Sequence, residues 1–457
     1  MMIKITSVLG AFTLVMSIGG RAQAGDHAAA GRALFEQPLA GTNGRTCATC
    51  HVLDEHTTLT PSHVERLRQT QPSDPLFARI DADDPSAAEP TYEHLSKGLV
   101  RVHLPLPDNM DVIDEEGRVV TPPDRTIFVW RGVPTVENVA YTAPYQFDGR
   151  ERDLPSQAQS AITAHSEGPA ISAEILQGLA AFELDVFSSW RARWVAERHA
   201  AGTPFDEIVL PEQWLPLSAA EQRGLEVFET ACAGCHGNAT THQITDRAVH
   251  DALFFELDSD GYIVHDVTPE GPVARLAPRP DSEFLNIGFG LLSGYGQLGI
   301  VPMANSTVSL PRYRYRFYTD GTRCQQVTDL PPIHPSGSGA PFDPTTILDE
   351  NGAPLVGPSL ANQWFSTDPG RAAITGNPLD FEAFDVPQLR GIAHTAPYYH
   401  DNSAATLEEV VDNYSRFILP FPALGLPPIF PPEVEGGAPE SLSPDQKADL
   451  LAFLRRL

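Results

Sequence analysis

Two stretches of the chain, 172–190 and 443–457, space their apolar residues as an amphipathic helix does. Positions three and four residues apart share one helix face, so each stretch predicts a helix with one buried side. Ser218 and Ser443 stand just ahead of such patterns and are expected helix starts. The apolar faces consist of Ile175, Leu176, Leu179, Phe182 and Val186 in the first helix, and of Leu450, Leu451, Phe453 and Leu454 in the second.

The chain loosely repeats itself. Ala30–Phe35 has a counterpart in Gln222–Phe228, and Val133–Asp148 lines up with Val386–Asp401. Each half therefore consists of a helix, a short motif, loops, a turn and a terminal helix. The predicted fold class is mainly α, with two tandem helical domains joined at a Pro-rich stretch near 202–217. We place them at 25–205 and 206–457, with long loops and short β-hairpins.

The second half carries an insertion at about 240–354. It contains much of the excess length of the second half, about 68 residues, because 168 positions separate Cys232 from His400 and only 100 separate Cys47 from Phe147. Short apolar runs bounded by turn residues, as around 258–261 and 349–352, predict hairpins here.

The N-terminus has the pattern of a cleaved signal peptide. Lys4 gives a positive start, an apolar run follows to about Ile18, and Ala22–Ala24 provides small residues for cleavage. The apolar run is too short to span a membrane comfortably. We expect residues 1–24 to be removed and the mature protein to be periplasmic, with no later membrane span.

Charge narrows the choice of partners. The formal net charge is -28, which argues against binding to nucleic acid and to anionic membrane surfaces. It is compatible with a basic redox partner, and equally with a generally acidic surface.

Two short motifs carry the chemistry, Cys47–His51 and Cys232–His236. Both read C-x-x-C-H, the attachment site of a c-type haem. The two thiols bond to the porphyrin vinyl groups, and the adjacent His reaches the iron. We therefore expect Cys47, Cys50, Cys232 and Cys235 to hold two covalent haems, with His51 and His236 as iron ligands.

Other interpretations of the cysteines are weaker. Structural zinc needs four Cys/His ligands, usually from two neighbouring pairs, but these pairs lie far apart. A thioredoxin-like pair needs a βαβ context and no His. Cys324, the fifth cysteine, has no partner left and is expected to be a free, partly buried thiol.

With these motifs the chain resembles the bacterial di-haem cytochrome c peroxidases and, within that superfamily, the MauG-like proteins. The most specific stretch is Val386–Tyr414; Thr367–Gly376, the approach to the second motif and the C-terminus also match. The resemblance implies two tandem cytochrome c-type domains. It also implies that peroxide reacts at the N-terminal haem, that the C-terminal haem handles electrons, and that a calcium ion sits between the domains.

The resemblance also implies catalytic residues. Fixed offsets after Phe147–Arg150 lead to Gln157 and Glu167, with Ala161 where the family has Pro. A carboxylate in a haem pocket can move the proton that O–O cleavage requires. His165 is a nearby alternative for this role or for an iron ligand. Arg390 is expected to pair with a haem propionate.

Several positions depart from the family pattern. Phe147 replaces a Trp between the haems, so Trp130 or a nearby Tyr is an alternative for electron hopping. Gly132 replaces an Asn near the calcium ion, whose other expected ligands are the main-chain carbonyls of Thr395 and Pro397. The segment after the first motif is also unusual. Four histidines in this segment or further along the chain are either surface residues or ligands of the first haem. They are His56, His63, His94 and His103.

Tyr414 separates the subfamilies. It lies fourteen residues after His400, where peroxidases have a Met ligand and MauG-like proteins a Tyr. A phenolate favours oxidised iron, whereas Met raises the potential. Thr406 and Glu409 predict a capping box for the helix that leads to Tyr414. If Tyr414 is instead a packed core residue, Met303 or a histidine is the next candidate ligand.

The sequence therefore predicts a periplasmic di-haem oxidoreductase. It would reduce hydrogen peroxide with electrons from a small redox protein, a cytochrome c or a cupredoxin, or from a protein substrate. Two alternatives remain: a non-enzymatic di-haem electron carrier, and a MauG-like enzyme that oxidises side chains of one dedicated partner protein.

Overall fold

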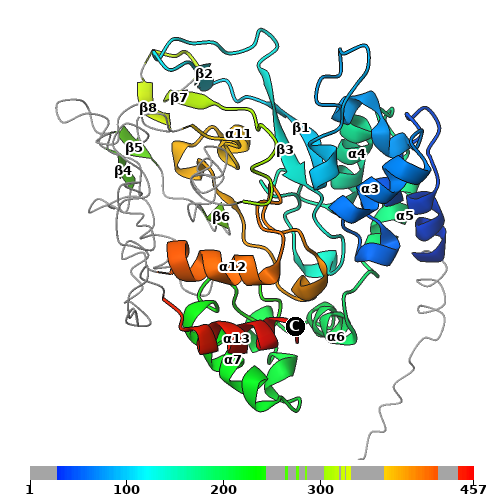
Figure 1. Cartoon of the computed structure of the whole chain (residues 1–457), viewed down its shortest axis with the longest axis vertical. Helices are drawn as coiled ribbons and strands as arrows, with labels where there is room; N and C mark the ends of the chain where they lie inside the picture. The colour runs from blue at the N-terminus through cyan, green and yellow to red at the C-terminus, as the bar shows by residue number, and fades with distance from the viewer. Residues whose placement is uncertain are drawn as a thin grey trace, which may run out of the picture.

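The computed structural model describes residues 28–242, 303–318, 321–324, 326–330, 365–419 and 441–457, together with three short strands between 263 and 285. It is rich in helices and contains short antiparallel strands (Figure 1). The helices are a first helix at 28–36, α2 (Cys47–Cys50), α3 (Pro61–Thr70), α4 (Leu154–His165), α5 (Ala173–Glu183), α6 (Trp190–Ala200), α7 (Ala219–Ala231), α11 (Ala372–Thr375), α12 (Leu407–Asn413) and α13 (Pro444–Leu454).

Each half contains one closely crossed helix pair, and the two crossings share their geometry. A Cβ built on Gly31 would lie 2.0 Å from the Gly178 carbonyl oxygen and 2.8 Å from Phe182 Cβ. A Cβ on Gly224 would lie 2.0 Å from the Asp449 oxygen and 2.7 Å from Phe453 Cβ. The backbones approach this closely only because both crossing positions are glycine. The helix at 28–36 with α5 thus corresponds to α7 with α13.

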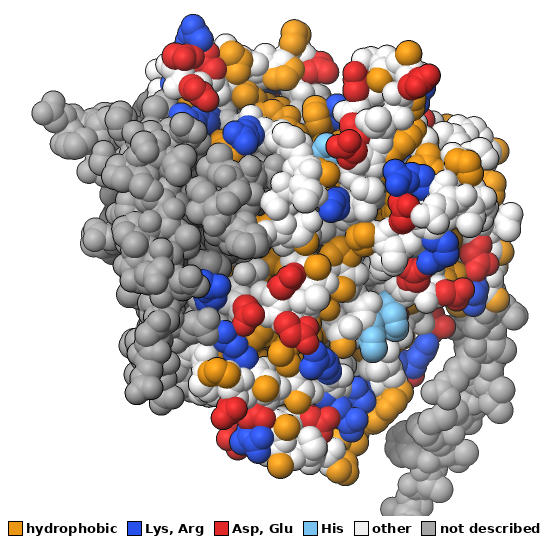
Figure 2. Space-filling model, in the orientation of Figure 1, with side chains coloured by type: hydrophobic (Ala, Val, Ile, Leu, Met, Phe, Trp, Pro, Cys, Tyr) orange, Lys and Arg blue, Asp and Glu red, His pale blue; other side chains and the backbone are white. Residues whose placement is uncertain are grey.

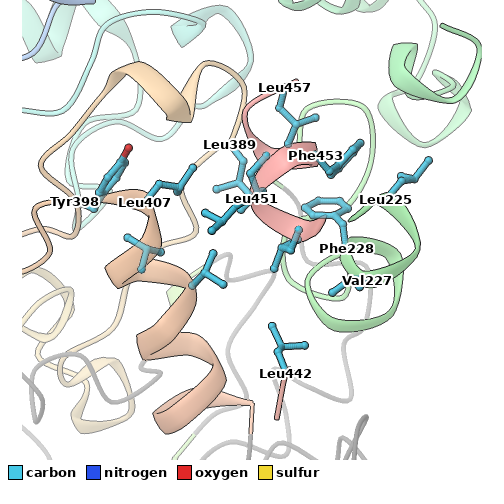
Figure 3. Close-up of a cluster of buried hydrophobic side chains, with 14 of the residues drawn as sticks. Leu225, Val227, Phe228, Leu389, Tyr398, Leu407, Leu442, Leu451, Phe453 and Leu457 are labelled. Atoms are coloured by element: carbon cyan, nitrogen blue, oxygen red, sulfur yellow. The ribbon is translucent and has the colours of Figure 1, made fainter. Parts of the chain in front are cut away.

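Both crossings continue into similar aromatic cores. Phe35 packs on Phe182 with ring centroids 5.0 Å apart, and Phe228 packs on Phe453 at 5.2 Å. Figure 3 shows the second core, where α7 and α13 interlock beside α12. The loops repeat too, because the Tyr145 and Tyr398 hydroxyls donate to the carbonyls of Val139 and Ile392 respectively.

The strands form small sheets. β1 (Leu99–Pro105) pairs antiparallel with β3 (Thr126–Gly132), and β7 (Arg314–Tyr318) lies between β2 (Met110–Ile113) and β8 (Gln326–Leu330). In the insertion, β4 (Ile263–His265) pairs with β5 (Ala274–Leu276), and β6 (Phe284–Leu285) pairs with β9 (Phe384–Asp385). The expected turns at 258–261 and 349–352 lie outside the described residues, as does the expected signal peptide.

Helix starts agree with the sequence, but one helix end does not. Ser218, Ser443 and Thr406 each form a capping box. The helix expected to run to Trp190 ends at Glu183, and α6 starts after Ser189. The reason is Asn138, whose backbone N–H donates to the Val186 carbonyl and whose side chain binds Ser188. These contacts hold the intervening residues in a non-helical loop.

A buried ion-pair network joins segments from both halves. The guanidinium of Arg131 contacts Asp148 at 2.5 Å and both oxygens of Asp368 at 2.6 and 2.9 Å. All three side chains are buried, and Arg371 also donates to the Asp148 carbonyl. Removing one partner of such a network leaves an uncompensated buried charge, so the contact ties the two segments together.

The visible surface mixes charges of both signs, with acidic and basic side chains next to each other (Figure 2). Within the described part of the chain, no helix has the length and apolar character needed to cross a bilayer.

Candidate haem-binding sites

The first C-x-x-C-H motif lies on the short helix α2. Thr46 caps this helix, and its side chain accepts from the Thr49 amide. His51 follows directly, and its Nδ1 lies 3.1 Å from the Thr57 carbonyl oxygen. Because a carbonyl only accepts, Nδ1 carries the hydrogen and Nε2 keeps its lone pair. Burial lowers the pKa of His51 to about 4, so the imidazole is neutral at pH 7, as a metal ligand must be.

A cavity opens beside this motif. Counted with its open mouth, it has a volume of about 1300 Å³. Cys47, Cys50 and His51 line one part of its wall, and Val133 and Pro134 line another. The predicted attachment residues therefore line one common cavity.

Helix α4 forms another wall of this cavity. Gln157, Ala161 and His165 all line it, and they share a helix face because they are spaced by four residues. Gln157 and His165 are eight helical positions apart, which corresponds to a separation of about 12 Å along the helix axis. The small Ala161 between them leaves room for a ligand. His165 Nδ1 is buried and has no hydrogen-bond partner among the described residues.

The structure brings Gln157 and His165 to the cavity but leaves Glu167 outside its lining. Glu167 is exposed and accepts a hydrogen bond of 3.0 Å from Asn43 Nδ2. Asn43 also donates to the His165 carbonyl, so one side chain connects the two positions. Glu167 thus stands close to the end of α4, outside the cavity wall.

Other residues expected near the first haem differ in position. His103 lines the cavity, whereas His56, His63 and His94 do not. Phe147 also lines it, whereas Trp130 does not line the cavity and stacks on His94 with ring centroids 4.1 Å apart.

The second motif follows α7. His236 Nδ1 donates to the Pro387 carbonyl at 3.0 Å, which again leaves Nε2 available, and burial lowers the pKa of His236 to about 4. Pro387 matches Pro134 in the internal repeat, but His51 Nδ1 is bound by the Thr57 carbonyl instead. Each motif histidine is thus oriented by a backbone carbonyl.

Tyr414 faces the second motif. It lies at the end of α12, on a short π-helical segment (Tyr414–Ile418), and packs against the same core as Cys232. Burial, followed by the neighbouring Tyr399 and the two motif thiols, raises the pKa of Tyr414. The phenol therefore lies near the Cys232 and Cys235 thiols.

Tyr399 is a neighbour that the sequence did not identify. Its hydroxyl accepts from Asn413 Nδ2 at 3.4 Å, and its ring packs against the same core as Tyr414. It lies just before His400 within Val386–Tyr414, the stretch most specific to the family. Its place in that stretch could have marked Tyr399 as a candidate site residue.

Arg390 is fully buried, and its guanidinium already has partners. Nη1 and Nη2 donate to the two Glu212 oxygens at 3.0 Å each, and Nε donates to the Ala239 carbonyl at 2.7 Å. A propionate would have to compete with this bidentate pair. Arg150 lines the first cavity and pairs with Asp148 through its Nε at 3.0 Å.

In the segment expected to bind calcium, Asn402 packs against Gly132. A Cβ on Gly132 would lie 2.3 Å from Asn402 Oδ1, so the Asn402 amide occupies the place of a side chain at position 132. The Gly132 amide also donates to the His400 carbonyl at 2.7 Å. The segment containing Thr395 and Pro397 therefore lies close to this strand end.

Glu183, at the end of α5, is a second residue that the sequence did not identify. It lines the first cavity, is 4% exposed, and its Oε2 has no hydrogen-bond partner among the described residues. Burial raises the pKa of Glu183 to about 8. No short-range pattern distinguishes it from a solvated glutamate at a helix end.

Comparison with a known protein family covers the first of these two sites. The family model described as di-haem cytochrome c peroxidase matches residues 26–185. Residues 26–185 are therefore similar to the di-haem cytochrome c peroxidases. This family consists of oxidoreductases, and its matched part here includes the first motif, α4 and α5.

Individual known proteins match either short stretches of the chain or most of it at low sequence identity. The cytochrome c551 peroxidase of Nitrosomonas europaea is 50% identical over 50 residues, 11% of this chain and 15% of the relative. A cytochrome-c peroxidase of Pseudomonas sp. (strain SCT) is 32% identical over 99 residues, 20% of this chain and 21% of its own. The chain thus spans about a fifth or less of these relatives. A solved MauG-like protein associated with microbial copper homeostasis is 20% identical, covers 94% of this chain and 88% of its own, and has a TM-score of 0.38.

The residues present fit the two haems that this family implies. Each motif places two thiols and a neutral, oriented imidazole together. The first site has a cavity beside the thiols, and the second has a buried phenol. These donors match c-type haem attachment and axial ligation.

Proposed function

We propose that the protein is a periplasmic di-haem oxidoreductase, built from two tandem cytochrome c-type domains, that reduces hydrogen peroxide. The observation that carries this proposal is the cavity between the first motif and α4. It contains the attachment thiols and His51 in one part of its wall, and Gln157 and His165 in another. A haem bound there would supply an iron with an open coordination position.

The protein side chains would bind peroxide and handle its protons. Reduction of one peroxide to two waters takes up two protons and two electrons. Gln157 has an amide that can both donate to and accept from a small oxygen ligand. Burial lowers the pKa of His165, so its neutral imidazole has a lone pair ready to take a proton. Glu167, outside the cavity wall, is placed to exchange protons with solvent.

We propose Tyr414 as the sixth ligand of the second haem. Its proximity to both motif thiols supports this role, as does its place at the end of the capped helix α12. A phenolate ligand stabilises oxidised iron. This favours a MauG-like function, in which the electrons come from side chains of a protein substrate, over a plain electron carrier. A cytochrome c or cupredoxin donor is the alternative source.

We also propose a calcium ion held by the Thr395 and Pro397 carbonyls. Asn402 Oδ1 would supply the amide oxygen that Gly132 lacks, because it fills that space. Oxygen ligands of this kind suit calcium. Metal analysis of the purified protein, with Asn402→Ala as the comparison, tests this assignment.

One experiment separates peroxidase from carrier. Electronic absorption and EPR spectra of the ferric protein, recorded with and without peroxide, report whether one iron has an open position. We expect one high-spin and one low-spin ferric signal, with the high-spin signal lost on adding peroxide. Two low-spin irons whose spectra do not change on adding peroxide would identify an electron carrier.

A further inference from the structure

Glu183 stands at a position where the second half of the molecule has a leucine. Gly31 meets Gly178 and Phe182, and Gly224 meets Asp449 and Phe453 in the same geometry. Phe182 therefore corresponds to Phe453, and the next residue, Glu183, corresponds to Leu454. Leu454 is 6% exposed and belongs to the core against which Cys232 packs.

The comparison shows what this position needs for packing alone. In the second half an apolar side chain fills it, whereas the first half places a carboxyl at 4% exposure. Burying a carboxyl without a partner costs free energy, and the Oε2 of Glu183 has no hydrogen-bond partner among the described residues. A residue that is costly for folding, at a place where leucine suffices, suggests a use in the chemistry of the cavity.

The surroundings of Glu183 leave its protonation open to change. The Cys47 thiol and the Tyr145 phenol interact electrostatically with Glu183. If Cys47 is bonded to a haem, its thioether carries no charge. Burial alone raises its pKa to about 8, so a modest change of charge in the cavity moves it between its two forms near neutral pH. The other titratable or charged side chains of the cavity wall are Arg45, Cys50, His51, His103, Arg131, Arg150 and His165.

We infer that the Glu183 carboxyl binds one proton from solvent when the haem in this cavity gains an electron, and releases it when that electron leaves. The inference rests on the proposed function, because it needs a haem in the first cavity. Each electron arrives from the protein's redox partner, and the added negative charge in the cavity is balanced by one proton on the carboxylate. Glu183 would thus store, inside the cavity, a proton that peroxide reduction consumes.

The test is a spectroelectrochemical titration of the full holoprotein from neutral to mildly alkaline pH. The potential of the first haem should fall as pH rises, by up to about 59 mV for each tenfold fall in proton concentration if one proton accompanies one electron. Glu183→Gln and Glu183→Leu should lower this slope. Glu174→Gln, on the exposed side of α5, should leave it unchanged. Leu454→Glu should create a slope at the second haem.

A second measurement does not depend on a variant that folds. Redox-difference infrared spectra of the wild type should contain a C=O band of a protonated carboxyl. A wild-type slope in Glu183→Gln, or a wild-type difference spectrum without this band, overturns the inference. Haem content and ferric EPR are recorded on the same samples. Failure of the proposed function would appear there as a missing haem or an absent high-spin signal, whatever happens at Glu183.

Discussion

The two motif sites are alike around the histidine and different elsewhere. In both, a backbone carbonyl accepts a hydrogen bond from Nδ1 of the motif His, and burial keeps the imidazole neutral. In the first site, α4 then lines an open cavity with Gln157, Ala161 and His165. In the second, Tyr414 packs toward the thiols from the end of α12.

This difference separates what the duplicated unit provides from what each copy adds. In the proposed function, the shared parts, a crossed helix pair and a tethered imidazole, would bind and orient the haem. The parts that differ would decide whether a small ligand can reach the iron. One fold unit would then suit both a ligand-binding site and an electron-transfer site, according to the residues that face each motif from outside it.

The largest effect should come from removing the attachment thiols of either site. Cys47→Ser with Cys50→Ser should lower the intact mass by one haem and abolish reactivity with peroxide, because the cavity loses its iron. Cys232→Ser with Cys235→Ser should also remove one haem but keep the high-spin signal of the first site. Mass spectrometry and ferric EPR check both. If both pairs lose the same EPR signal, the proposed division of roles is wrong.

The next effect concerns protons at the first site only. Glu167→Gln should slow the reaction with peroxide by roughly 10²–10⁴-fold, the range for loss of a general acid–base group. Haem content should stay unchanged, and Glu174→Gln serves as the control on an exposed helix position. Stopped-flow absorption measures the rate. Wild-type kinetics in Glu167→Gln, combined with slow kinetics in His165→Gln, would assign the proton transfer to the cavity-lining imidazole.

Local signals in the sequence predicted the local parts of both sites. The C-x-x-C-H spacing, the capping box at Thr406 and the repeat containing Pro134 and Pro387 act over a few residues or recur in both halves. The sequence did not reveal contacts between distant positions, such as Arg131 with Asp368. These depend on how segments more than 200 residues apart meet.

The same limit explains the individual misses. A helix that ends at Glu183 rather than Trp190 depends on Asn138, about 50 residues earlier. The burial of Glu183 depends on the helix crossing at Gly31, and the pairing of Arg390 depends on Glu212. Each residue type would suit a solvated position equally well, so its role became visible only with the fold.

A smaller effect is expected at the second site. Tyr414→Met should raise the potential of the second haem, because a neutral thioether replaces an anionic oxygen that favours oxidised iron. Tyr414→Phe should leave an open or water-filled position and convert the second haem toward the behaviour of the first. Redox titration and EPR measure both variants. An unchanged low-spin signal in either variant would show that Tyr414 is not a ligand and would direct attention to Met303 or a histidine.

The smallest effect should be equal in the two halves, because it concerns only what they share. Gly31→Ala and Gly224→Ala each place a Cβ 2.0 Å from a backbone oxygen of the partner helix, so the helices must separate. We expect each to lower the free energy of unfolding by about 1–3 kcal/mol, the usual cost of overpacking.

Gly178→Ala is the matched control. Its Cβ would meet only the Leu34 side chain, at 2.9 Å, and alanine favours the helix by about 1 kcal/mol. Urea unfolding followed by circular dichroism compares the three. A cost at Gly31 without one at Gly224 would mean that the two crossings are not equivalent, and the correspondence of Glu183 with Leu454 would lose its basis.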